Sequence, residues 1–68
     1  MRKQKTYWDI KNDMHNYFAC NVKECRVERD YLVISCFDEQ KALDTMRALK
    51  NAGLDMYRDN NVIVAWYN

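Results

Sequence analysis

The sequence contains few of the residues that interrupt regular structure or perform chemistry. Its 68 residues include one glycine, no proline, one serine and one histidine. A single glycine cannot supply a glycine-rich phosphate loop or a flexible linker. One serine and one histidine leave few groups for nucleophilic or acid–base catalysis. We therefore expect a single domain that is not an enzyme, holds no cofactor and takes no small-molecule substrate.

Long apolar runs are missing as well. No stretch approaches the ~18 apolar residues of a membrane span. The basic start "MRKQK" is not followed by the apolar segment of a secretory signal. The three cysteines are an odd number, which favours free thiols in a reducing compartment. These features predict a cytoplasmic protein with no membrane partner.

The size of the chain limits how much core it can bury. With 49% hydrophobic and 31% charged residues it is globular rather than disordered. A domain this short buries only about 60% of its unfolded surface and often gains stability from a disulfide, a metal or a second subunit. The size of the chain alone therefore favours association with another chain.

The N-terminal part of the sequence predicts a helix over 7–20. Thr6 and Asp9 fit a capping box, in which each side chain accepts from the other residue's backbone N–H. Apolar residues follow at three- and four-residue steps, at Tyr7, Ile10, Met14 and Tyr17. Asn21 tolerates the left-handed conformation that closes a helix.

A second helix is predicted between Asp38, which fits an N-cap, and Gly53, which fits the residue just after a helix. Its apolar stripe would be Leu43, Met46 and Leu49. The spacing between the two end signals suits an ordinary globular helix.

The remaining segments predict four strands. They span 22–28, 31–37, 54–58 and 62–67. The second and fourth, "YLVISCF" and "VIVAWY", are apolar at nearly every position, as in strands covered on both faces. A two-residue turn at 29–30 would join the first pair. The asparagine-containing segment 59–61 would join the second pair as a three-residue loop.

The predicted order α-β-β-α-β-β is a repeated helix–hairpin unit, with halves 6–37 and 38–68 after a basic tail at 1–5. Apolar positions recur 32 residues apart in the helix and first strand, and 30 apart in the second strand. The crossover helix makes the second and third strands parallel. Placing the two most apolar strands in the middle gives a sheet of order 1-2-4-3, with both helices on one face. This two-layer α+β sandwich resembles, in topology, a circularly permuted ferredoxin-like fold.

Alternation along the strands then divides core from surface. Val62, Val64 and Trp66 are predicted to lie beneath the helices. The opposite face is predicted to be apolar and aromatic, with Val22 at its margin. Its candidate partner-binding residues are Tyr31, Val33, Phe37, Tyr57, Ile63 and Tyr67.

An aromatic centre with a polar edge is typical of a protein interface. We expect a small protein-binding module, a regulator or inhibitor whose first expected partner is its own copy, in a homodimer, with another protein as the alternative. Small phage or mobile-element proteins that block host machinery are similar in size and composition, which is an analogy only.

Two other interpretations stay open. Aromatic residues on central strands can stack bases, and Arg2, Lys3, Lys5, Arg26 and Arg58 could contact phosphates, which would make the protein a nucleic-acid binder. From residue 6 onward, however, the chain has eight basic and ten acidic residues, and this negative balance disfavours binding to phosphates. The residues His15, Cys20, Cys25 and Cys36 could bind zinc, but they lack the close cysteine pairs of structural sites, so no metal is expected.

Overall fold

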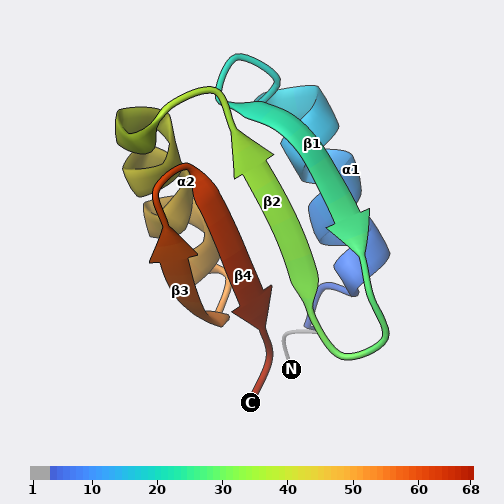
Figure 1. Cartoon of the computed structure of the whole chain (residues 1–68). Helices are drawn as coiled ribbons and strands as arrows, with labels where there is room; N and C mark the ends of the chain where they lie inside the picture. The colour runs from blue at the N-terminus through green and yellow to red at the C-terminus, as the bar shows by residue number, and fades with distance from the viewer. Residues whose placement is uncertain (1–3) are drawn as a thin grey trace.

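The computed structural model describes residues 4–68, which fold into two helices and a four-stranded sheet. The elements are α1 (Tyr7–Tyr17), β1 (Val22–Val27), β2 (Leu32–Cys36), α2 (Glu39–Asn51), β3 (Asp55–Asp59) and β4 (Val62–Trp66). The sheet order is β1-β2-β4-β3, and every neighbouring pair is antiparallel. Both helices lie behind the sheet in Figure 1, with α1 behind β1 and α2 behind β3. The predicted α+β sandwich, its element order and its strand order are confirmed.

The start of α1 follows the sequence signal, but its end does not. The Thr6 hydroxyl accepts from the Asp9 N–H, and the Asp9 carboxylate accepts from the Thr6 N–H, both at 3.1 Å. The helix ends at Tyr17 rather than at 20, because the N–H groups of Asn21 and Val22 both donate to the Phe18 carbonyl. Asn21 is not left-handed: within residues 4–68, positive φ occurs at Gly53 and at Asn60.

The buried face of α2 is rotated from the predicted stripe. Asp38 caps the helix by accepting from the Lys41 N–H at 2.8 Å. Thr45 is fully buried, and its hydroxyl donates to the Lys41 carbonyl at 2.8 Å. Because this bond satisfies the hydroxyl, a polar residue can occupy the core face. Leu43 is left 39% exposed instead of buried.

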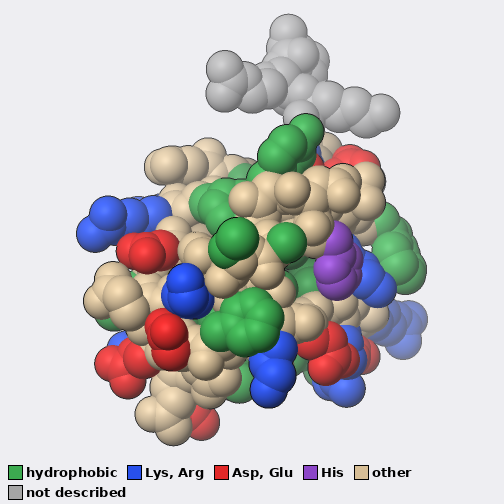
Figure 2. All heavy atoms as spheres, turned by 90° about the horizontal axis from the view of Figure 1, so that it is seen from above, with side chains coloured by type: hydrophobic (Ala, Val, Ile, Leu, Met, Phe, Trp, Pro, Cys, Tyr) green, Lys and Arg blue, Asp and Glu red, His purple; other side chains and the backbone are tan. Residues whose placement is uncertain are grey.

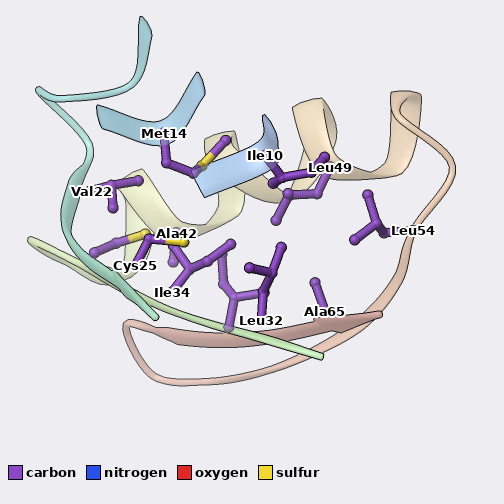
Figure 3. Close-up of a cluster of buried hydrophobic side chains, with 12 residues drawn as sticks. Ile10, Met14, Val22, Cys25, Leu32, Ile34, Ala42, Leu49, Leu54 and Ala65 are labelled. Atoms are coloured by element: carbon purple, nitrogen blue, oxygen red, sulfur yellow. The ribbon is translucent and has the colours of Figure 1, made fainter. Parts of the chain in front are cut away.

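The core lies in one layer between the helices and the sheet. Figure 3 shows Ile10 and Met14 of α1 and Leu49 of α2 above the side chains of Leu32 and Ile34 on β2. The buried hydrophobic residues are Ile10, Met14, Val22, Cys25, Leu32, Ile34, Cys36, Ala42, Leu49, Leu54, Ile63 and Ala65. Apart from Met14, none of these side chains is larger than leucine, so the core of residues 4–68 consists of small and medium-sized side chains without a fully buried aromatic ring.

The register of β4 differs from the prediction by one residue. Asp59 pairs with Val62, so the β3–β4 connection is a two-residue turn at Asn60 and Asn61 rather than a three-residue loop. Asn60 has a φ of 55°, a conformation that asparagine tolerates and tight hairpin turns use. Shifting a strand by one residue exchanges its two faces. Ile63 is therefore fully buried, although it was predicted on the open side of the sheet.

A bulge in β1 corrects a second assignment. Val22 pairs with Cys36 and Glu24 pairs with Ser35, which leaves Lys23 as the extra residue. Val22 consequently points into the core rather than to the open face. The bulge also explains why the spacing of the internal repeat changes along the chain. Equivalent positions are 32 residues apart before Lys23 and 31 apart after it, as for Leu32 and Ile63. The two hairpins have equal turns.

Tyr7 fastens α1 to the sheet. Its hydroxyl donates to the Asp30 carbonyl and accepts from the Tyr67 N–H, both at 2.9 Å. Its ring stacks on Tyr67, with centroids 5.5 Å apart. Tyr67 therefore lies on the helix side of the sheet, against its predicted place on the open face. One side chain thus joins the first turn of α1, the β1–β2 turn and the residue after β4.

Replacing Tyr7 by Phe should lower the free energy of unfolding by about 1–2 kcal/mol, because the Tyr67 N–H and the Asp30 carbonyl both lose their partner. Replacing Tyr67 by Phe should cost nothing, since its buried hydroxyl has no hydrogen-bond partner among residues 4–68. Urea unfolding measures both changes, with Tyr17→Phe at a 79% exposed position as control. Equal losses for the two tyrosines would contradict this account.

Candidate functional site

The strand pairing gives an apolar centre and a charged rim to the side of the sheet that is turned away from both helices. This side faces the viewer in Figure 1. We call it the open face. Its central residues are Tyr31, Val33, Ser35, Tyr57, Val62, Val64 and Trp66. Its rim residues are Glu24, Arg26, Glu28, Asp55 and Asp59. These side chains come from all four strands, so the fold itself brings them together.

A row of directly paired residues crosses the middle of the open face. Val33 of β2 pairs with Val64 of β4. Arg26 flanks this pair on β1, and Tyr57 flanks it on β3. Both valines are half-buried by their neighbours. The centre is therefore an aliphatic floor with a cation at one side and a phenol ring at the other.

Aromatic residues collect at one end of the open face. The rings of Tyr57 and Trp66 lie 6.3 Å apart in a tilted arrangement. Tyr31 is at the same end, because it precedes Leu32, whose partner on β4 is Ala65. Tyr57 is 58% exposed and Tyr31 is 40% exposed, so both rings are accessible. Exposed tyrosines beside a tryptophan are the side chains that most often dominate binding in protein interfaces.

The six predicted partner-binding residues separate into three groups. Tyr31, Val33 and Tyr57 lie on the open face. Ile63 and Tyr67 lie on the helix side, for the register reason given above. The sixth, the phenylalanine at position 37, follows β2 and is 54% exposed. Figure 2, which shows the domain from above, has hydrophobic side chains interspersed with charges of both signs.

The alternation pattern does not reveal three residues of the open face, which are Val62, Val64 and Trp66. All three were assigned to the core because the β3–β4 connection was counted as three residues. The adjacent Asn60 and Asn61 carried the signal for a two-residue turn. With that turn, the same alternation rule gives the observed faces.

Carboxylates occupy the four corners of the open face. Glu24 and Asp59 end one row of paired residues, which crosses the sheet through Ser35 and Val62. At the other end, Asp55 pairs with Trp66 on β4, and the Glu28 N–H donates to the Tyr31 carbonyl at the margin of β1. These positions are about 13 Å apart along the strands and about 14 Å apart across them.

Few cations balance these carboxylates. The Arg26 guanidinium lies 3.5 Å from the Glu28 carboxylate. Lys23, the bulged residue, is exposed on the outer edge of β1. The rim is negative even when both cations are counted against the four carboxylates.

The residues of the nucleic-acid interpretation are not gathered on one surface. Arg26 lies on the open face, but Arg58 lies on the helix side, 3.7 Å from the Glu39 carboxylate. Lys5 pairs with Asp13 of α1 at 2.5 Å, and this hydrogen bond raises the pKa of Lys5. The remaining two, Arg2 and Lys3, lie outside the described residues.

The zinc candidates are not assembled either. Within residues 4–68, no three His, Cys, Asp or Glu side chains are placed to hold a metal ion. Cys20 is exposed, whereas Cys25 and Cys36 are buried and unpaired with each other. Burial raises the pKa of the Cys25 thiol to about 11 and also raises that of Cys36. The Cys36 thiol donates to the Thr45 hydroxyl at 3.9 Å, so it is a packed core group.

The chain matches no protein-family model, no curated protein and no solved structure. Neither helix of the described chain has the length and apolarity to span a lipid bilayer.

The three cysteines should differ sharply in reactivity. A water-soluble thiol reagent at mildly alkaline pH should modify Cys20 quickly in the folded protein, because it is exposed. Cys25 and Cys36 should react only after urea unfolds the chain, since both are buried and their pKa values are raised. Mass spectrometry of the modified peptides measures this. Fast labelling of Cys25 in the native protein would show that the β1 side of the core opens readily.

Proposed function

We propose that the protein is a small binding module, without enzymatic activity of its own, that docks another protein on the open face. The observation that carries this proposal is the accessible aromatic cluster of Tyr31, Tyr57 and Trp66 beside an aliphatic floor. Covering such a surface removes apolar area from water and contributes roughly 25 cal/mol for each Å². By occupying part of its partner's surface, a module of this kind acts as a regulator or inhibitor.

The small core supports the same proposal. The helices cover only one side of the sheet, so the apolar residues on the other side stay partly exposed after folding. A docked protein supplies the missing layer, as a third element packed on the open face.

Nucleic acid is the second candidate ligand, because Tyr31, Tyr57 and Trp66 offer rings on which bases could stack. The four carboxylates of the rim weigh against it, since phosphate attraction dominates such binding. Fluorescence anisotropy with single-stranded oligonucleotides at low salt separates the two. Tight binding that falls steeply as salt rises would favour nucleic acid over protein.

Peptides selected from a random display library on the immobilised protein should bind the open face. Replacing Tyr57 by Ala should weaken them about tenfold or more, because an exposed tyrosine in an aromatic cluster is a typical binding hot spot. Tyr17→Ala, at a still more exposed tyrosine on α1, is the control and should leave binding unchanged. Both variants should keep their stability within about 0.5 kcal/mol. Peptides insensitive to Tyr57 would contradict the proposal.

A further inference from the structure

We propose that the open face docks a cationic segment of another protein, an apolar surface flanked by lysine or arginine, rather than a second copy of this chain. This inference rests on the proposed function and adds the chemistry of the partner. The apolar centre provides the contact area, and the charged rim decides what can cover it.

The arrangement of the rim follows from the repeat. Beyond the bulge, equivalent residues are 31 positions apart, which relates Glu24 to Asp55 and Glu28 to Asp59. The central pair Val33 and Val64 is also 31 apart. An approximate two-fold axis therefore passes through this pair, perpendicular to the sheet. It places an acidic residue at every corner of the apolar floor.

Pairing with a second copy brings like charges together in both arrangements that align the strands of the two sheets. If the two-fold axis of a dimer runs along the strands, β1 of one copy lies over β3 of the other, and Glu24 meets the partner's Asp59. If the axis runs across the strands, Glu24 meets the partner's Glu28, and Arg26 meets its own counterpart. Like charges juxtaposed in an interface disfavour the complex. The homodimer expected from composition thus conflicts with the charge pattern.

A cationic segment satisfies the same pattern. The corners are about 13–14 Å apart, which equals about nine residues of α-helix. A helix laid across the floor can place apolar residues on Val33 and Val64 while basic residues at its two ends reach the carboxylates. Tyr57 adds an exposed ring on which a lysine or arginine can stack.

Two synthetic amphipathic helical peptides provide the test. Both carry the same apolar stripe, and one has lysines at its ends where the other has glutamates. Anisotropy of the labelled peptides is measured across salt on the wild type and on two double variants. Glu24→Gln with Asp59→Asn alters the rim, and Glu39→Gln with Asp44→Asn makes the same charge change on α2. Sedimentation at tens of micromolar reports self-association.

The lysine peptide should bind and should weaken as salt rises, whereas the glutamate peptide should bind about tenfold less well. The rim variant should lose about fivefold in affinity, and the α2 variant should lose nothing. Equal binding of both peptides, or equal loss in both variants, would overturn the inference. A wild-type dimer broken by Tyr57→Glu would also overturn it, yet would leave protein binding by the open face intact. Failure of both peptides to bind a monomeric protein at low salt would count against both proposals.

Discussion

The register of β4 decides what every other residue of the sheet can do. It is set by the two-residue turn at Asn60 and Asn61, and the end of β2 holds that turn in place. The Cys36 N–H donates to the Asn61 carbonyl at 2.8 Å, and the Asn61 side-chain amide donates to the Cys36 carbonyl at 2.7 Å. Because this contact joins a turn to a strand far away in sequence, a slip of β4 would break it. The same slip would drive Trp66 into the core and expose Ile63.

Much of the fold could be predicted from local signals. The capping box at Thr6, the cap at Asp38 and the stop at Gly53 are short-range chemistry, and each works as the sequence indicates. The strand order followed from the apolar strands 31–37 and 62–67, since strands covered on both faces belong in the middle of a sheet. These features depend on neighbouring residues or on composition, which a sequence displays directly.

The assignment of faces could be predicted only in part. In β2, Leu32 and Val33 fall on the expected sides, because the turn before them has the expected length. In β4, a predicted connection of three residues instead of two exchanged the two faces of the whole strand. In β1, the bulge at Lys23 reversed Val22, and no local signal marks a bulge in "NVKEC". The face assigned to a strand residue depends on the length of the turn or bulge that sets the strand's register. An error of one residue in that length therefore reverses the faces of all residues counted from it.

The internal symmetry of the open face bears on the direction in which a partner can lie. The four corner carboxylates look the same after half a turn about the Val33–Val64 pair, so they attract a segment equally well in either polarity. Direction is therefore chosen only where the two halves differ. Arg26 stands opposite Tyr57, and Ser35 occupies the place that Trp66 takes in the second half. Ser35 lines a hollow together with Glu24, Arg26 and Val33, whereas Trp66 makes the other end of the floor aromatic. A partner's bulkiest side chain can distinguish these two ends.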